Sequence, residues 1–513
     1  MDLLKELLKL SSKKWNDMKH INKLLLITSA TLLVMWGCKE NTLEVLNEND
    51  PDFVKVYAKG EDVENVASGL FNAVFGGEHD YDGAAMMLAV AADHVTCSHG
   101  NAAMWHMSSE PRDLAWDNSP SYANAINTKT TYDDMYSAIS TANNVIKAIQ
   151  SGVDIGDGGS GNDRSMAVAR FVQGVAYGNL ALIYDRAHVV DEAKTVEGEL
   201  GTAVPYAEVV TAAVGYLDEA IALSNSAFTI PASWFGSPAD ITSTEFQRMC
   251  NTAAARILSY APRNKAELAT VPWDRVKTYA DNGITEDWIV VMDGTNKWYF
   301  EAEDYLTFPG WGKTDMYVVH LMDPSQPQHW EESPTFAPPA STNPLDNRLN
   351  TDFEFTPSNG FRPDRGYFNF SNYRMSRYDD IYVAAIGPKP EVMKAENDML
   401  RAEARAYTGD LAGAAAIINE GTRTTRGEMP PVPAVLEDVV QAIHHERHVE
   451  LYTTGIGVQF FEMRKLDLLQ KGTPLHMPLP AAILETLRET PPFYTFGTVA
   501  AADGIGTSNG GWR

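Results

Sequence analysis

The stretch VMKAENDMLRAEARAYTGDLAGAAAIINEGTRTTRG, residues 392–427, predicts two helices joined by a tight turn. Small residues such as Ala406 close the first helix, and a glycine followed by Asp410 supplies the turn and the N-cap of the second. Ala414 and Ile418 share one face of the second helix, so they can pack back on the first. The pattern therefore predicts a helix hairpin.

Helical periodicity continues through most of the chain on either side of this hairpin. Residues 60–77 place Val63, Val66, Leu70 and Val74 on one helical face. Further amphipathic stretches cover residues 132–150, 163–187, 205–223, 243–262 and 271–283. Alternating, strand-like runs are few, and small residues around a Gly-Asp turn resemble a tetratricopeptide hairpin. The predicted fold is mainly α, built from stacked helix pairs.

Between about residues 281 and 387 the helical periodicity disappears. Pro, Gly, Asn and aromatic residues cluster there instead. Irregular regions of this length in a compact protein are functional or disordered, and the many aromatic residues argue against disorder. We therefore expect a large loop-rich insertion in the helical body, and we expect it to bind the ligand.

The N-terminal residues predict a lipid-anchored, exported protein. MKHINKLLLITSATLLVMWGCKE has basic residues, then an apolar run that is shorter than the ~20 residues of a membrane span. Gly37 and Cys38 follow it and resemble a bacterial lipobox, with Cys38 as the lipidated residue. We expect a signal peptide over residues 1–38, with translation starting at Met18, then a tether over 39–60 and a single helical domain over 61–513. An uncleaved membrane anchor is the alternative.

Charge and cysteine content exclude several protein classes. The chain has 513 residues and a formal net charge of −27, which argues against nucleic-acid partners and against electrostatic docking on anionic lipid. Besides Cys38 there are two cysteines, Cys97 and Cys250, which we expect to be buried and unpaired. The protein is therefore not a disulfide scaffold.

The stretch QAIHHERHVELY superficially resembles the metal-binding helix of a zinc protease. His444 and His448 are four residues apart, but Glu446 lies midway and projects roughly 200° from either histidine. It therefore could not activate a water held between them, and no third ligand is evident. We expect no metal site here, and we expect Glu446, Arg447 and Glu450 to make ionic and capping contacts.

Other motifs give no catalytic assignment. One Gly-Gly-x-Gly-x-Asp copy lies at residues 158–163, but calcium-binding β-rolls need tandem copies, so we expect a flexible helix–helix loop. No nucleophile elbow, phosphate loop or dinucleotide fingerprint occurs. A carboxylate pair for glycoside hydrolysis stays open, because the separation of the acidic side chains is not visible in the sequence.

Tryptophans in polar, turn-rich contexts are the best ligand-binding candidates. A flat indole can stack on the apolar face of a sugar ring while polar neighbours bond its hydroxyls. Each such tryptophan could instead anchor its own loop to the core. The expected ligand-binding residues are Trp105, Trp298, Trp311 and Trp330, with Asn101 and Arg112 as polar partners.

Several of these segments together resemble the SusD/RagB family. The resemblance rests on the lipobox, VLNENDPD, residues 392–427, IHHERHVELYTTGIGVQFFEMRKLDLL and HMPLPAAILE. It covers nearly the whole chain after Cys38 and is most specific over 391–485. Gln459 and Glu462 stand where Arg and Asp are common in the family, which predicts a weaker local ion network.

The resemblance implies a surface-exposed lipoprotein of the outer membrane that binds a nutrient. Its ligand would be an oligosaccharide, or a peptide in some branches, and it would pass the ligand to a SusC-like, TonB-dependent transporter. It implies no enzyme activity and no cofactor. Two other classes stay open: a secreted glycoside hydrolase with a helical body, and a purely structural helical-repeat adaptor.

Overall fold

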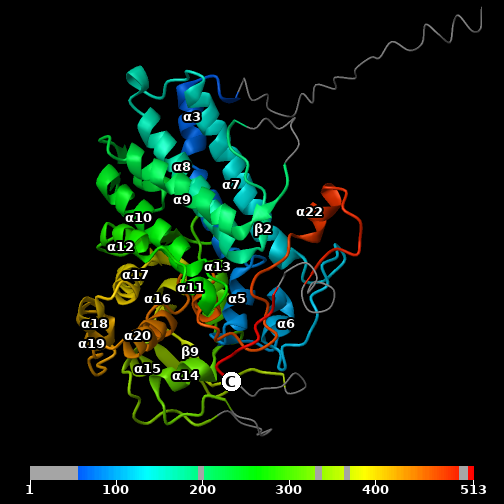
Figure 1. Ribbon diagram of the computed structural model, residues 1–513, viewed down its shortest axis with the longest axis vertical. Coiled ribbons are helices and arrows are strands. Elements are labelled where there is room, and N and C mark those ends of the chain that lie inside the picture. Colours follow the sequence, from blue (N-terminus) through cyan, green and yellow to red (C-terminus); the bar gives the residue numbers. More distant parts are fainter. Residues whose placement is uncertain (1–55, 194–200, 330–337, 363–369, 496–505) are drawn as a thin grey trace, which may run out of the picture. The chain divides into compact units, whose positions relative to one another are not determined.

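The computed structural model describes residues 56–193, 201–329, 338–362, 370–495 and 506–513 (Figure 1). Met18, Cys38 and Trp330, about which the sequence makes predictions, lie outside these residues. The described residues belong to one unit, Val56–Arg513.

Helices dominate the described chain, as predicted. Those of the N-terminal half are α3 Gly60–Ala67, α4 Leu70–His79, α5 Ala85–Ala91, α6 Met104–Ser108, α7 Ile126–Gln150, α8 Asn162–Ile183, α9 Tyr206–Leu223, α10 Ser243–Tyr260, α11 Lys265–Leu268 and α12 Trp273–Asp281. Those of the C-terminal half are α13 Glu301–Thr307, α14 Met316–Met322, α15 Arg348–Thr351, α16 Asp379–Tyr382, α17 Lys394–Tyr407, α18 Leu411–Glu420, α19 Thr422–Thr425, α20 Leu436–Val449, α21 Val458–Lys465 and α22 Ala481–Thr486.

The strands described are short and form antiparallel pairs. These pairs are β1 Val95–Thr96 with β7 Lys313–Thr314, β2 Arg186–Ala187 with β3 Val204–Pro205, β4 Thr229–Ile230 with β5 Ile241–Thr242, β8 Phe353–Phe355 with β9 Tyr373–Met375, and β6 Trp288–Asp293 with β10 Ile386–Val392. In the last pair, Ile386 lies opposite Asp293. The strands therefore fasten segments together rather than forming a sheet layer.

The helices pack against one another in a continuous series. α7 packs on α8, α8 on α9, α9 on α10, α10 on α12, α12 on α17, and α17 on both α18 and α20 (Figure 1). α8 is long and apolar enough to cross a membrane, but 89% of its apolar window is buried inside the fold, as in a central core helix. Glycines allow its neighbours to approach closely: a Cβ at Gly174 would lie 2.5 Å from Leu217 of α9, and one at Gly178 would lie 2.4 Å from Ile257 of α10.

The predicted hairpin is confirmed by α17 and α18. The Asp410 side chain accepts a hydrogen bond from the Gly413 amide at 2.9 Å and so caps α18, while Gly409 adopts a φ of +92° in the turn. Ala414 and Ile418 are buried in a core cluster that α17 and α20 share. The loop containing Gly158 connects α7 to α8, as predicted.

The region between residues 281 and 387 is more structured than its sequence predicts. It contains β6 to β9 and the short helices α13 to α16, and β10 begins in it. Its elements are too short for periodicity to reveal, and their stability comes from contacts with distant segments. The region is therefore loop-rich, as predicted, but it also contains short helices and strands that the sequence pattern does not show.

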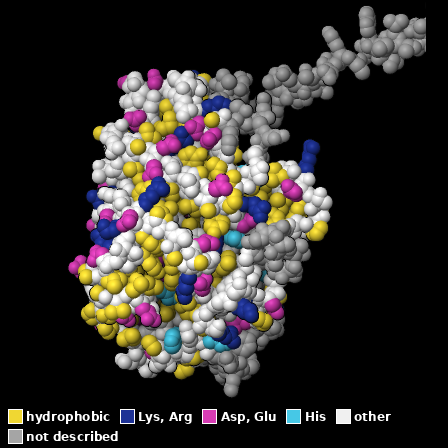
Figure 2. All heavy atoms as spheres, in the orientation of Figure 1, with side chains coloured by type: hydrophobic (Ala, Val, Ile, Leu, Met, Phe, Trp, Pro, Cys, Tyr) yellow, Lys and Arg dark blue, Asp and Glu magenta, His cyan; other side chains and the backbone are white. Residues whose placement is uncertain are grey.

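The remaining composition-based predictions concern cysteines and charge. Cys97 and Cys250 are both buried and form no disulfide bond among the described residues, as expected. On the face seen in Figure 2, acidic and basic side chains are scattered among apolar patches rather than gathered into one basic surface.

Candidate functional site

Four aromatic side chains from three segments meet near the surface. Tyr81 follows α4, His99 follows β1, Tyr305 lies in α13 and Trp311 follows it. The ring centroids of Tyr81 and Tyr305 lie 4.5 Å apart, those of Tyr305 and Trp311 5.5 Å, and those of His99 and Trp311 5.4 Å. All four residues are partly exposed. We call Tyr81, His99, Tyr305 and Trp311 the aromatic cluster.

A strained backbone segment presents Asn101 to this cluster. The Asn101 amide donates a hydrogen bond to the Tyr81 hydroxyl at 2.5 Å. The next residues, Ala102 and Ala103, both adopt left-handed conformations, with φ of +49° and +54°. Such conformations cost roughly 1–2 kcal/mol each in residues other than glycine, and strain of this kind gathers at ligand sites.

Acidic groups border the aromatic cluster. Glu301 Oε2 accepts a hydrogen bond from the Tyr81 amide at 3.4 Å, and Asp304 accepts one from the Tyr299 hydroxyl at 2.6 Å. Burial raises the pKa of both carboxyl groups above the usual range, and Asp80 raises that of Glu301 further. Rings flanked by carboxylate, amide and phenol groups offer stacking faces together with hydrogen-bonding partners for hydroxyls.

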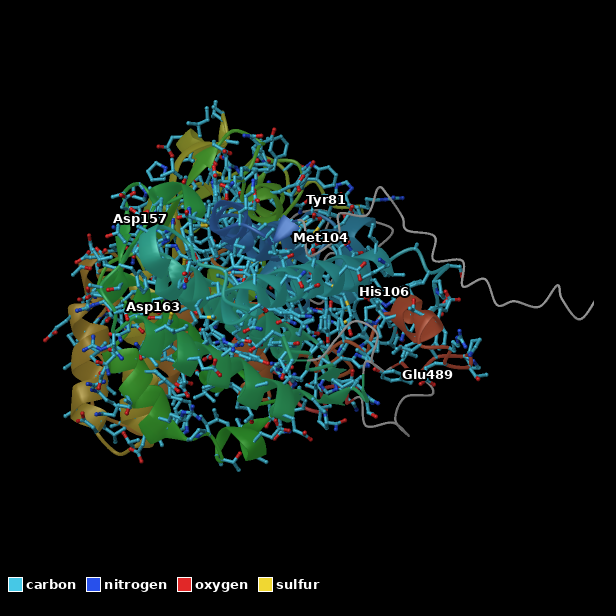
Figure 3. The ribbon with its side chains drawn as sticks, turned by 90° about the horizontal axis from the view of Figure 1, so that it is seen from above. Tyr81, Met104, His106, Asp157, Asp163 and Glu489 are labelled. Atoms are coloured by element: carbon cyan, nitrogen blue, oxygen red, sulfur yellow. The ribbon has the colours of Figure 1, made fainter. Side chains whose placement is uncertain are left out.

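The structure brings three of the predicted ligand residues to one place. Trp311 belongs to the aromatic cluster, Asn101 bonds its Tyr81, and the Trp105 backbone amide donates a hydrogen bond to the His99 backbone carbonyl at 3.2 Å. In the view of Figure 3, Tyr81 and Met104, the neighbour of Trp105, project onto the same part of the molecule, away from Asp157 in the α7–α8 loop. Tyr81, His99 and Tyr305 were missed because the prediction considered only tryptophans among the aromatic residues.

Trp298 and Arg112 lie in the interior. Trp298 is 5% exposed, and its ring centroid lies 5.8 Å from that of Phe71 and 5.2 Å from that of Phe75. Arg112 forms a buried ion pair with Asp93. Neither side chain reaches the surface, so the expected contact of these two residues with a ligand is not supported.

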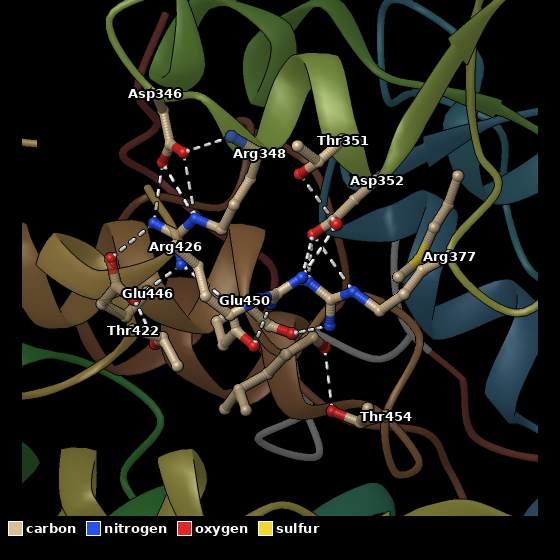
Figure 4. A network of polar contacts seen from close by, with 12 residues as sticks. Asp346, Arg348, Thr351, Asp352, Arg377, Thr422, Arg426, Glu446, Glu450 and Thr454 are labelled. Carbon is tan, nitrogen blue, oxygen red and sulfur yellow. Dashed lines mark hydrogen bonds and ion pairs between the residues drawn. The ribbon is translucent and has the colours of Figure 1, made fainter. Parts of the chain in front are cut away.

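The HHERH stretch makes buried ionic contacts, as predicted. Arg348 is fully buried and lies 2.7 Å from oxygens of both Asp346 and Glu446 and 3.0 Å from Glu450 (Figure 4). Arg348 therefore joins the irregular region to α20. Asp352 extends the network through ion pairs to neighbouring arginines.

A second buried ion network contains Glu462. Arg447 lies 2.5 Å from Glu462 and 2.7 Å from Glu403, and Lys465 lies 2.6 Å from Glu403 and 3.1 Å from Glu462. All four side chains are buried. Glu462 therefore pairs with both Arg447 and Lys465, so the ion network is formed in this chain.

The histidines of the stretch do not form a metal site. His444 Nε2 lies 2.6 Å from the Tyr317 hydroxyl, and His445 Nε2 lies 2.7 Å from Asp346. His448 packs on His444, with ring centroids 4.4 Å apart, and on His94, at 5.6 Å. Among the described residues, the one group with metal-ligating spacing contains none of these histidines.

The cavities described lie away from the aromatic cluster. One of about 830 Å³ lies along α20 and is lined by Tyr317, Tyr407 and His445 among others, and one of about 470 Å³ lies beside Arg248 and Trp288. Neither of these two cavities is lined by residues of the aromatic cluster. We prefer it as the ligand site because its rings are partly exposed and polar groups surround them.

Solved structures share this fold. A SusD superfamily protein from Parabacteroides distasonis aligns with a TM-score of 0.57 and 14% identity, covering 83% of this chain and 97% of that chain. A SusD-like carbohydrate binding protein from Bacteroides vulgatus aligns with a TM-score of 0.55 and 17% identity, over 81% and 84% of the two chains. No family model matches the chain, and neither does any curated protein sequence. The chain therefore has a SusD-like fold.

Proposed function

Starting from the SusD-like fold, we propose that this protein binds an oligosaccharide at the aromatic cluster and delivers it to a SusC-like, TonB-dependent transporter. The observation that carries the proposal is the group of partly exposed rings bordered by Asn101, Glu301 and Asp304. Aromatic faces bind the apolar faces of sugar rings, and the polar groups bind hydroxyls. A solved protein of this fold is described as carbohydrate binding, which supports the same ligand class.

Glycan binding is tested with an array and matched variants of the purified protein. Trp311→Ala removes one stacking face, worth on the order of 0.5–1.5 kcal/mol, so binding should weaken roughly 2- to 12-fold. Tyr216→Ala is the control, because Tyr216 is a partly exposed aromatic residue stacked on Tyr177 in another part of the fold. Equal binding by parent and Trp311→Ala would place the ligand elsewhere, and binding to peptides alone would favour the peptide-binding branch.

The proposed lipid anchor and the proposed transporter both place the protein at the outer membrane. Cys38, with its lipid, would hold the protein on the outer face of the outer membrane, and several acyl chains contribute ~0.8 kcal/mol per buried CH₂. Purification from mild detergent should recover the transporter with this protein. Recovery of the protein alone would count against the complex.

A glycoside hydrolase is the competing function. The position of Glu301 beside Tyr81 favours it, because a carboxyl group that borders the proposed sugar site could act as a general acid, and burial raises its pKa as that role requires. Incubating the purified protein with the bound glycan decides between the two, because a hydrolase releases new reducing ends and a binding protein does not.

A further inference from the structure

Three buried metal-ligating side chains from distant segments meet inside the fold. Glu78 and His79 end α4, and Glu391 lies in β10. One ligand atom from each lies within 4.8 Å of the others, and His79 Nε2 lies 2.9 Å from Glu391 Oε2. The three residues are at most 5% exposed. An imidazole and two carboxylates are a suitable ligand set for a divalent transition metal.

Outer hydrogen bonds hold these side chains in orientation. His79 Nδ1 lies 2.7 Å from Glu303 Oε1, and the Asn179 amide donates to Glu78 at 2.7 Å. A carboxylate on the far nitrogen of a histidine is the usual support of a metal-binding imidazole. The other oxygen of Glu303, Oε2, is buried without a hydrogen-bond partner. One buried carboxylate oxygen next to the cluster is therefore unsatisfied, which is unusual inside a protein.

A small cavity beside the cluster supplies room. It measures about 40 Å³ and is lined by Glu78 and Glu391 together with Asn179, Thr252 and Arg256. A cavity of this size accommodates one or two water molecules. Water from this cavity can complete the coordination of an ion held by three protein ligands.

We propose that Glu78, His79 and Glu391 bind one divalent transition-metal ion, for which zinc is the best match. The ion is structural: it links α4 to β10 across 312 residues of sequence, deep in the fold and apart from the aromatic cluster. The proposal departs from the sequence-based expectation of no metal. That expectation tested only the HHERH stretch, because Glu391 lies too far along the chain to be associated with His79.

Metal analysis of the untagged full-length protein tests this site. The protein is produced in medium supplemented with ZnCl₂, passed over a desalting column and analysed for zinc by mass spectrometry. The parent should retain one zinc ion per chain, and Glu391→Gln and His79→Gln should retain little or none. Glu303→Gln leaves the three ligands in place and should weaken zinc binding about 10- to 100-fold.

Glu403→Gln is the matched control, because Glu403 is equally buried but belongs to the Arg447 network. It should retain zinc like the parent, with circular dichroism checking that each variant is folded. Absence of zinc from the parent, or undiminished zinc in both Glu391→Gln and His79→Gln, would overturn the proposal.

If those variants do not fold, the parent is refolded from urea with and without Zn²⁺. A higher unfolding midpoint with zinc supports the site, and equal midpoints overturn it.

Discussion

The histidine group around His448 predicts a specific loss of stability in mild acid. His94 is 1% exposed, and neither of its ring nitrogens has a hydrogen-bond partner. Burial alone lowers the pKa of His94 from 6.5 to about 3, because a charged imidazole would lie among the uncharged rings of His448 and Tyr452. The folded protein therefore keeps His94 neutral at pH values where the unfolded chain protonates it.

The direction and the size of the stability loss in acid follow from proton linkage. Below pH 6.5 the unfolded chain binds one proton at His94 that the folded chain does not, so the free energy of unfolding falls as the pH falls. The loss is about 1.4 kcal/mol per pH unit, or roughly 2 kcal/mol between about pH 6.5 and about pH 5. The loss continues toward the folded-state pKa of about 3.

Replacing His94 by leucine isolates this contribution. Urea unfolding of the parent and of His94→Leu is followed by fluorescence at about pH 7.5 and about pH 5, and the parent should lose about 2 kcal/mol more than the variant. Other titrating groups occur in both proteins, so they cancel in the difference. His320→Leu is the control, because His320 is partly exposed and bonded to the Gln326 carbonyl at 2.7 Å. If the parent and His94→Leu lost the same unfolding free energy between the two pH values, the reasoning would be refuted.

Three further outcomes are expected. Arg348→Met leaves buried carboxylates without their cation, so the free energy of unfolding in urea should fall by about 3–5 kcal/mol. Asp410→Ala removes the cap of α18 and should cost about 0.5–2 kcal/mol by the same measurement, whereas Asp410→Asn should cost less. Cys38→Ala should shift the protein from the membrane to the soluble fraction on cell fractionation; retention in the membrane would favour an uncleaved anchor.

Features of this fold that depend on residues close together in the chain could be predicted from the sequence. The α17–α18 hairpin depends on helix spacing and on the Asp410 cap, both of which involve residues close together in the chain. The structural role of Glu446 was also predictable, because its angular position on the helix excluded a zinc protease. Its partner Arg348 was not predictable, since it lies 98 residues away in a region without periodicity.

The candidate site was predicted only in part for the same reason. Trp298 and Trp311 both lie in polar, turn-rich sequence, yet Trp298 is buried and Trp311 is partly exposed. The difference arises because Phe71 and Phe75, from α4, cover the Trp298 ring. Composition near a tryptophan therefore does not reveal whether a distant segment packs over it.

The pairing of β6 with β10 brings together the two ends of the segment that joins them. The two strands lie side by side, with Asp293 opposite Ile386, so the segment between them leaves and rejoins the helical body at one seam. That segment contributes Tyr305 and Trp311 to the aromatic cluster. The same segment also contains Tyr317 and Arg348, which bond His444 and Glu446 of α20 and so fix it to the helical body. Because the entropic cost of closing a loop rises slowly with its length, changes of length are tolerated in the loops between these fixed points rather than at them.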